Sequence, residues 1–197
     1  MITIYGDPIS GNCLKVKWTA ERLGIPFTWV DVDVTKRETR TAAFLAMNPA
    51  GQVPTVLLDD ERVLAQSNAI ILHLAEDSPL IPADRYDRAK MYEWLFWEQY
   101  SHEPTIAVVR FHMKYLGKPR SEVDAGLIQR GAAALTLMDR ALAGREFLVG
   151  EGLTLADIAL VAYTRFAHDG GFVLADYPAL DAWVSRVEAE LPIKEPR

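Results

Sequence analysis

The sequence predicts an α+β domain at the N-terminus and an all-helical domain after it. Three observations support this prediction. Strand and helix patterns alternate in the first 77 residues, two prolines break the pattern near residue 80, and apolar residues then recur at helical spacing. We therefore expect domains over residues 1–77 and 87–197, joined by a linker over residues 78–86.

The N-terminal domain begins with the order strand, helix, strand. Residues 2–5 form a short run of β-branched and aromatic side chains, and residues 27–34 alternate in the manner of a second strand. Between them, apolar residues at helical spacing stop at Gly24, a residue type that favours a helix C-terminus.

The rest of this domain has the order strand, strand, helix. Residues 55–58 and 62–64 predict a hairpin that turns through Asp59 and Asp60. The apolar residues 69–72 then predict a helix. The complete order, βαβ followed by ββα, is that of a thioredoxin-like domain.

The C-terminal domain contains three amphipathic stretches, at residues 127–142, 155–166 and 180–191. Before the second stretch, Thr154 and Asp157 have the spacing of a capping box, in which each side chain bonds the backbone N–H of the other residue. We interpret this pair as structural and assign it no catalytic part.

Composition excludes several classes of function. The net charge is −6 with acidic and basic residues interleaved, which argues against nucleic acid and anionic membranes as partners. A single cysteine permits no intrachain disulfide and fits a reducing compartment, and the chain starts without a secretion signal, so we expect a cytoplasmic protein. No apolar run is long enough to span a bilayer. The four histidines lack metal-ligand spacing, so we expect no metal and surface or capping positions for these side chains.

The most informative motif is a proline turn followed by a polar dipeptide that opens a helix. Pro54 lies where the strand 55–58 begins, and because proline donates no ladder hydrogen bond, it indicates an edge strand or a cis Val53-Pro54 turn. Such a turn presents the backbone of Val53 sideways, for strand-like pairing with an extended thiol peptide. Ser67 stands at a helix N-terminus, whose N–H groups favour a carboxylate.

Residues 48–54 and 66–70 resemble the segments that hold glutathione in the cytosolic glutathione transferases. The resemblance covers nearly the whole chain, including the capping box, and indicates a serine-type member of bacterial appearance, similar to the theta, phi and zeta classes. It implies the glutathione transferase fold, glutathione as co-substrate, a small hydrophobic electrophile as second substrate, and a homodimer. In that family the helical domain contributes the electrophile site and the dimer contacts.

The resemblance also assigns glutathione contacts by position. It assigns Gln66 and Ser67 to the γ-glutamyl group, Val53 and Pro54 to the cysteinyl part, and Arg40 and Gln52 to the glycine carboxylate. An arginine in such a position favours a bidentate bond to the carboxylate, although Arg40 is equally well explained as a solvated surface residue.

The loop between the first strand and the first helix holds the candidate catalytic residues, Ser10 and Asn12, with Cys13 next to them. Ser10 and Cys13 have the spacing of a redox C-x-x-C pair with serine in the leading place, which excludes two-cysteine redox chemistry. In the resembled serine-type transferases this hydroxyl donates a hydrogen bond to the glutathione sulfur. Such a bond lowers the pKa of a thiol by about one to two units from about 8.5. The substrate's sulfur is then the nucleophile.

The sequence leaves other interpretations of this loop open. Ser10 is alternatively a helix N-cap only, and Asn12 is either a cap or a second donor near the sulfur. Cys13 is either a small buried hydrophobe or a thiol with a lowered pKa in the first helical turn. A reactive Cys13 would make the protein a thiol transferase or reductase, and a third alternative is a non-catalytic glutathione-binding protein.

Aromatic residues crowd the first helix after the linker. Aromatics on both faces of residues 92–100 exceed what one core-facing stripe requires, so one face can line an apolar cleft or a dimer contact. By analogy of position, the candidate electrophile pocket consists of Trp97, Tyr100, Phe111, Tyr115, Tyr163 and Phe166. Core packing is the alternative for each of them.

Overall fold

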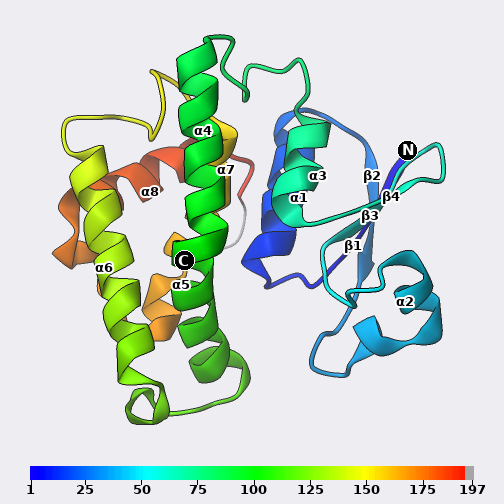
Figure 1. The fold of residues 1–197 in the computed structure, drawn as a ribbon, viewed down its shortest axis with the longest axis horizontal. Coiled ribbons are helices and arrows are strands. Elements are labelled where there is room, and N and C mark those ends of the chain that lie inside the picture. The colour runs from blue at the N-terminus through cyan, green and yellow to red at the C-terminus, as the bar shows by residue number, and fades with distance from the viewer. Residues whose placement is uncertain (194–197) are drawn as a thin grey trace. The chain divides into compact units, whose positions relative to one another are not determined.

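The computed structural model describes residues 1–193. It divides the chain into two compact units, Met1–Ser78 and Pro79–Arg197. The strands and helices α1 to α3 belong to the first unit, and helices α4 to α8 belong to the second (Figure 1).

The N-terminal unit has a thioredoxin-like fold. Its elements are β1 Ile2–Gly6, α1 Gly11–Arg22, β2 Phe27–Asp31, the 3-10 helix η1 Glu38–Arg40, α2 Ala42–Met47, β3 Thr55–Leu57, β4 Val63–Ala65 and α3 Ser67–Leu74. The four strands form one sheet in the order β2-β1-β3-β4, in which β1 is parallel to β2 and antiparallel to β3, and β3 is antiparallel to β4. The predicted fold class of this domain is confirmed.

Helices α1 and α3 pack against each other and close the core of this unit. Trp18 of α1, Ile70 and Ile71 of α3, and Ile4 and Val56 of the central strands are fully buried. Burying each of these side chains contributes roughly 1.5–3 kcal/mol. The core therefore fixes the two helix N-termini relative to the sheet.

The register of the sheet brings the connecting segments that matter for function to one end. Gly6 at the end of β1 pairs with Asp31 at the end of β2, and Tyr5 pairs with Thr55 at the start of β3. Thr55 in turn pairs with Ala65 at the end of β4. The chain therefore leaves β1, β2 and β4 at the same end of the sheet at which it enters β3.

Two expectations about the strands need correction. The second strand ends at Asp31 instead of residue 34, because the Asp33 carboxylate accepts from the N–H groups of Thr35 at 2.9 Å and Lys36 at 3.1 Å and turns the chain. The edge-strand explanation of Pro54 is wrong, since β3 lies between β1 and β4. The alternative, a cis Val53-Pro54 peptide bond, is confirmed.

The second unit is helical, as predicted. Its elements are α4 Arg85–Trp97, the π-helical turn η2 Glu98–His102, α5 Glu103–Arg110, a second π-helical turn η3 Phe111–Tyr115, the 3-10 helix η4 Arg120–Glu122, α6 Ala125–Leu142, α7 Leu155–Thr164, the 3-10 helices η5 Ala167–Gly170 and η6 Leu174–Asp176, and α8 Pro178–Glu190. The first four follow one another without a break. Pro104 explains the first π-helical turn, because proline has no N–H and its ring clashes with the carbonyl four residues earlier, at Tyr100.

The capping box at the start of α7 is present and is part of a buried network. One oxygen of the Asp157 carboxylate accepts from the N–H and the hydroxyl of Thr154, both at 2.9 Å. The other oxygen accepts from Leu148 N–H at 3.0 Å and from Trp183 Nε1 at 2.9 Å. Burial raises the pKa of Asp157, and these four hydrogen bonds act against that rise. The structural interpretation of this pair stands.

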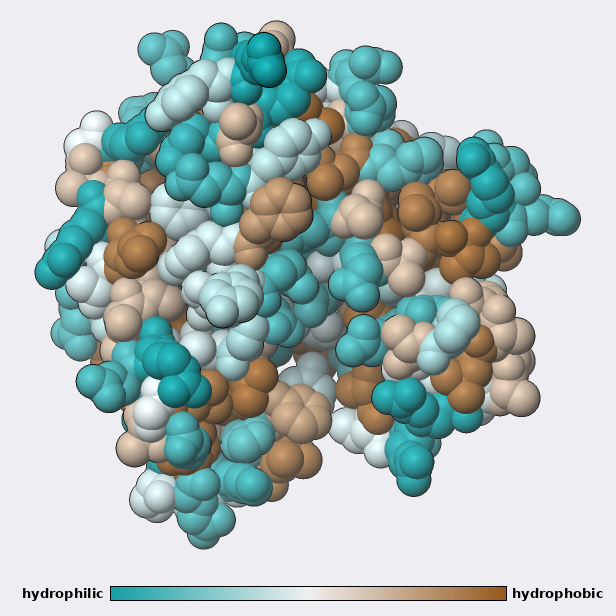
Figure 2. All heavy atoms as spheres, in the orientation of Figure 1, coloured by the Kyte–Doolittle hydropathy of each residue, from teal (hydrophilic) through white to brown (hydrophobic). Residues whose placement is uncertain are grey.

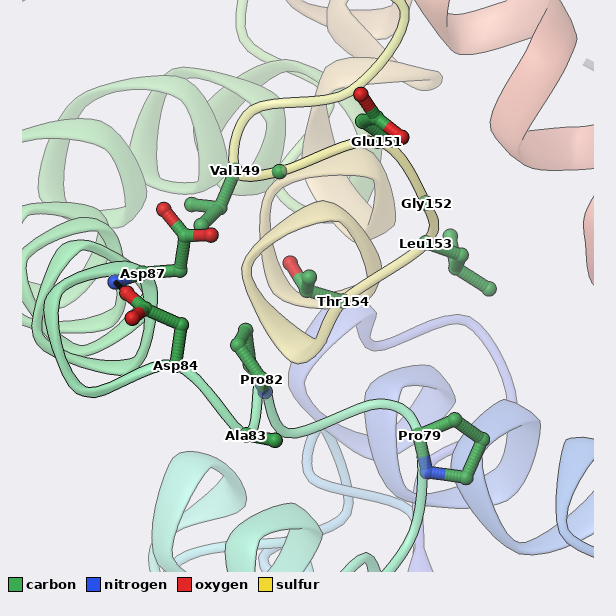
Figure 3. Close-up of a pocket in the computed structure, with 11 residues that line it drawn as sticks. Pro79, Pro82, Ala83, Asp84, Asp87, Val149, Glu151, Gly152, Leu153 and Thr154 are labelled. Atoms are coloured by element: carbon green, nitrogen blue, oxygen red, sulfur yellow. Dashed lines mark hydrogen bonds between the residues drawn. The ribbon is translucent and has the colours of Figure 1, made fainter.

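A small pocket of about 220 Å³ lies in the helical unit, between the start of α4 and the loop before α7 (Figure 3). Asp84 in its wall is the N-cap of α4, where its carboxylate accepts from the N–H groups of Tyr86 at 2.8 Å and Asp87 at 2.9 Å. Asp87 lies in the first turn of the same helix, where a negative charge favours the helix dipole. Helix capping therefore accounts for Asp84, and the helix dipole accounts for Asp87.

The face of the helical unit drawn in Figure 2 carries interspersed hydrophilic and apolar residues. Across residues 1–193, no helix combines the length and the apolar character that crossing a membrane requires.

Candidate active site

The β1–α1 loop places Ser10 at the start of α1. The Asp7 carboxylate accepts from Ile9 N–H at 3.0 Å, and the Asp7 carbonyl accepts from Ser10 N–H at 3.1 Å. Ser10 is the N-cap residue, but its side chain makes no capping hydrogen bond. The hydroxyl interacts instead with the sulfur of Cys13. The interpretation of the Ser10 hydroxyl as a helix cap only is therefore wrong.

Cys13 lies behind this loop and is fully buried. Its sulfur accepts from Asp7 N–H at 3.3 Å. Burial raises the pKa of the thiol to about 12, although the hydrogen bonds from the Ser10 side chain and the Asp7 backbone act in the opposite direction. The structure therefore contradicts the alternative in which Cys13 is a reactive thiol with a lowered pKa. Cys13 behaves as a small buried hydrophobe.

Asn12 connects α1 to α3. Its side-chain oxygen accepts from Lys15 Nζ at 2.8 Å and from Ser67 Oγ at 3.1 Å. Lys15 Nζ also lies 3.5 Å from Ser67 Oγ. The structure thus brings together Asn12 and Ser67, which are 55 residues apart in the sequence.

Lys15 is absent from the sequence-based predictions, although it is fully buried beside two predicted site residues. Lysines are ordinarily exposed, so a lysine in a predicted helix gives no reason to expect a buried position. The available signal was its position three residues after Asn12, which puts both side chains on one helix face.

Asn48 holds the turn that leads into β3. Its side-chain nitrogen donates to the Gln52 carbonyl at 2.8 Å and to Thr55 Oγ1 at 3.1 Å, and its oxygen accepts from Ala50 N–H at 3.1 Å. These bonds fix both sides of the cis Val53-Pro54 peptide bond.

The register places this turn beside the start of α3. Thr55 pairs with Ala65, so Val53 and Pro54 precede one member of the pair while Gln66 and Ser67 follow the other. Gln66 has a φ of 71°, a left-handed conformation that costs roughly 1–3 kcal/mol for a residue other than glycine. Gln66 is exposed and Ser67 is buried at the first position of α3.

Arg40 lies across the same turn. Its Nη1 donates to the Ala50 carbonyl at 3.3 Å. Gly51 has a φ of 61°, and a Cβ atom there would lie 2.6 Å from Arg40 Nη1. Only glycine therefore combines this backbone conformation with the close approach of Arg40. Arg40 and Gln52 are both exposed.

In the helical unit, three of the six aromatic residues predicted for the electrophile pocket lie together. The ring centroids of Phe111 and Tyr115 are 5.1 Å apart. The Arg110 guanidinium lies 6.0 Å from the Tyr115 ring centroid and 4.6 Å from that of Phe166. Arg110 is held in turn by Asp169, whose carboxylate oxygen is 3.0 Å from Nε. In this cluster the Arg110 cation packs against two aromatic rings.

The other three aromatic residues have different surroundings. Trp97 packs edge-on against Trp94 with a centroid distance of 5.2 Å. Tyr163 is 6% exposed in α7, whereas Tyr100 is 88% exposed. The structure therefore presents Tyr163 as a core residue and Tyr100 as a surface residue.

His102 also departs from its predicted surface or capping position. It is fully buried, and its Nε2 lies 3.0 Å from Thr164 Oγ1. Within the part of the chain that the structure describes, no group of three or more His, Cys, Asp or Glu side chains is placed to hold a metal ion.

Comparison with known proteins identifies the family of this chain. Family models described as the N-terminal and C-terminal domains of glutathione S-transferase match residues 9–77 and 100–190. The chain is 31% identical to glutathione S-transferase theta-1 of Mus musculus, over 96% of this chain and 83% of the mouse protein. It is 30% identical to glutathione S-transferase 3 of Zea mays, over 95% of this chain and 89% of the maize protein.

Solved structures give the same result. The crystal structure of a glutathione S-transferase from Pseudomonas fluorescens [Pf-5] matches with a TM-score of 0.92 and 45% identity, covering 95% of this chain and 94% of that chain. The fold and the matched domains define a two-domain protein with a thioredoxin-like and a helical part. The chain belongs to the glutathione S-transferase family.

Proposed function

We propose that this protein is a serine-type glutathione S-transferase that conjugates the thiolate of glutathione to a small hydrophobic electrophile. One observation carries the proposal. The Ser10 loop, the cis Val53-Pro54 turn and the start of α3 converge at one end of the sheet, because Tyr5, Thr55 and Ala65 are paired across it.

Each part of this sheet end suits one part of the tripeptide. The N–H groups at the start of α3, with Ser67, suit the γ-glutamyl carboxylate, and the Gln66 side chain suits the adjacent ammonium. The backbone of Val53 suits strand-like pairing with the cysteinyl residue. Arg40 and Gln52, exposed beside the same turn, suit the glycine carboxylate.

The reaction uses the sulfur of the co-substrate. Ser10 and Asn12 act as hydrogen-bond donors that favour the thiolate, and the thiol proton passes to solvent. The sulfur lone pair then forms the bond to carbon, and the leaving group departs with the electrons of the bond that breaks. Cys13 takes no part, because its thiol is buried and almost fully protonated.

The helical unit supplies the second substrate's site in this proposal. Phe111, Tyr115 and Phe166 are the apolar part of that site, and Arg110, which is paired with Asp169, packs against the rings of Tyr115 and Phe166. The proposal includes a cytoplasmic homodimer, which is what the resemblance to the cytosolic glutathione transferases implies.

Glutathione binding is the first test. Isothermal calorimetry of the wild type should detect binding. Ser67→Ala should weaken it by about 1–3 kcal/mol, the loss expected if the Ser67 hydroxyl turns from the Asn12 oxygen to donate to the charged carboxylate of glutathione. Ser185→Ala is a matched control, because Ser185 is on α8 and its hydroxyl donates locally to the Asp181 carbonyl. A wild type that binds no glutathione would remove the proposal as a whole.

The sulfur chemistry is the second test. Ser10→Ala should raise the pKa of the bound glutathione thiol by about one to two units, because it removes a donor to the thiolate. Conjugation of chlorodinitrobenzene near neutral pH should fall, while glutathione affinity changes little. Thiolate absorbance against pH measures the first effect and initial rates measure the second.

Three results would point elsewhere. If Ser10→Ala keeps its activity and Cys13→Ala loses it, the thiol-transfer alternative is correct. If glutathione binds and no electrophile in a broad panel is conjugated, the protein is a non-catalytic glutathione-binding protein. If Ser10→Ala leaves the thiol pKa unchanged, another donor stabilises the thiolate.

A further inference from the structure

Lys15 is a fully buried lysine on the face of α1 that carries Asn12. Its neighbours Cys13, Leu14 and Val16 are buried as well. Burying an ammonium group is costly unless it is hydrogen-bonded or paired, so a buried lysine needs polar partners close to its nitrogen. Two polar partners of the Lys15 nitrogen, Asn12 and Ser67, are already placed in the candidate site.

The chemistry of the ammonium group fixes the orientation of Asn12. Lysine has three donors and no acceptor, so the atom of the Asn12 amide that faces it must be the oxygen. The distance of 2.8 Å between Lys15 Nζ and Asn12 Oδ1 is that of a good hydrogen bond. Ser67 Oγ donates to the same oxygen at 3.1 Å. The amide nitrogen of Asn12, with its two donors, therefore lies on the other side of the group.

The position of Asn12 gives this orientation a functional meaning. Asn12 is in the first turn of α1, directly after the Ser10 loop, and it is only half-buried. A cation bonded to the amide oxygen polarises the amide and strengthens its N–H groups as donors. The same cation lies 3.5 Å from the hydroxyl of Ser67, at the start of α3. One buried charge thus contacts the residues proposed for the sulfur and for the γ-glutamyl carboxylate.

We propose that Lys15 is a positioning residue of the glutathione site, whose ammonium group holds the Asn12 oxygen and so directs the Asn12 amide nitrogen toward the sulfur of bound glutathione. This inference rests on the proposed function. It makes the orientation of a catalytic donor depend on a residue that does not touch the substrate.

Lys15→Met is the principal variant, because methionine keeps much of the volume and removes the charge and the donors. We expect the pKa of the bound glutathione thiol to rise by about one unit, and conjugation near neutral pH to fall by about tenfold. Affinity for S-methylglutathione, which has no thiol, should change little. Lys17→Met is the matched control, since Lys17 is on the same helix with its side chain 28% exposed and pairs with Glu21. It should change none of these quantities.

A double-mutant cycle tests whether Lys15 acts through Asn12. In the Asn12→Ala background, Lys15→Met should add little further change in the thiol pKa, because the group that Lys15 orients is already missing. Full additivity would overturn the proposal and mean that the Lys15 charge acts on the sulfur directly. An unchanged thiol pKa in Lys15→Met alone would overturn it as well.

A third variant keeps the test decisive if Lys15→Met does not fold. Asn12→Asp retains oxygens for Lys15 and Ser67 and replaces the two N–H donors with a carboxylate oxygen. The pKa of the bound thiol should rise, and no rise would overturn the proposal. If the proposed function itself is wrong, the result will be different: the wild type will bind neither glutathione nor S-methylglutathione.

Discussion

Cys13 and Lys15 lie two residues apart on α1, and both are fully buried. Burial disfavours the charged form of the Cys13 side chain, and the neighbouring groups decide how far. The sulfur of Cys13 has the Asp7 N–H and the Ser10 side chain beside it, and the pKa of the thiol still rises to about 12. Lys15 is placed against two oxygens, those of Asn12 and Ser67, which suit a cation. One helix thus keeps a thiol protonated and accommodates an ammonium group.

We predict that Cys13 is inert in the folded protein. Native protein should not react with a chromogenic disulfide reagent near neutral pH, and one thiol per chain should appear in guanidinium chloride. The raised pKa also makes stability pH-dependent. The contribution of the thiol is complete below its ordinary pKa of 9.0 and is lost as pH rises toward about 12. Rapid labelling of native protein would contradict this assignment.

At the scale of the element, the turn over residues 48–54 shows how a short loop acquires a fixed shape. Asn48 bonds to both ends of the turn, and Arg40 lies across it at Gly51. Gly51 has a left-handed φ, and the Arg40 guanidinium lies close to its Cα. A side chain at this position would strain the backbone and would also clash with the guanidinium.

We predict that Gly51→Ala weakens glutathione binding as well as stability. The left-handed backbone should cost about 1–2 kcal/mol in the free energy of unfolding. The new Cβ would also displace Arg40 from the turn. Gly144→Ala is the matched control, because Gly144 has a φ of 74° and a Cβ added there would meet no atom within 4 Å. Chemical denaturation should show similar losses in both variants, and calorimetry should show weaker binding in Gly51→Ala alone. Equal glutathione affinities would exclude a role for Arg40 in binding.

Local patterns explain why the elements were predictable and why their details were not. Alternation and helical spacing placed β1, α1, β3 and β4 correctly because each depends on nearby residues. The early end of β2 depends on the side chain of Asp33, and the π-helical turn at Glu98–His102 depends on the missing N–H of Pro104. Neither effect changes the apolar pattern. The partners of Lys15 include Ser67 on a second helix, so this contact becomes visible only in three dimensions.

At the scale of the whole molecule, each unit has its own source of stability. The N-terminal unit relies on apolar side chains between α1, α3 and the sheet. The helical unit adds buried polar pairs, of which Arg110 and Asp169 form one, with Arg110 4% exposed. Burial raises the pKa of the Asp169 carboxyl, but the hydrogen bonds and charges of Arg110 and Lys114 outweigh it, so the pKa is lowered overall.

We predict that Asp169→Asn destabilises the helical unit by roughly 3 kcal/mol, because it leaves the Arg110 charge buried without a counter-charge. Asp60→Asn, which breaks a pair with Arg62 on the surface, should leave stability nearly unchanged. Since the folded pKa of Asp169 is depressed, its contribution is present above the unfolded pKa and lost as pH falls through the folded one. Urea unfolding should therefore show wild type and Asp169→Asn converging in acid. A constant difference between them across that pH range would contradict this account.

The burial of Cys13 has a consequence for how long such an enzyme can work. A transferase collects alkylating compounds next to a nucleophile, and a thiolate of its own would compete with the co-substrate for them. The chain contains 1 cysteine, and that thiol is inaccessible and protonated. Under the proposed function, the protein therefore presents its substrates with no reactive thiol except the one that glutathione brings, and we expect no self-alkylation of Cys13 during turnover.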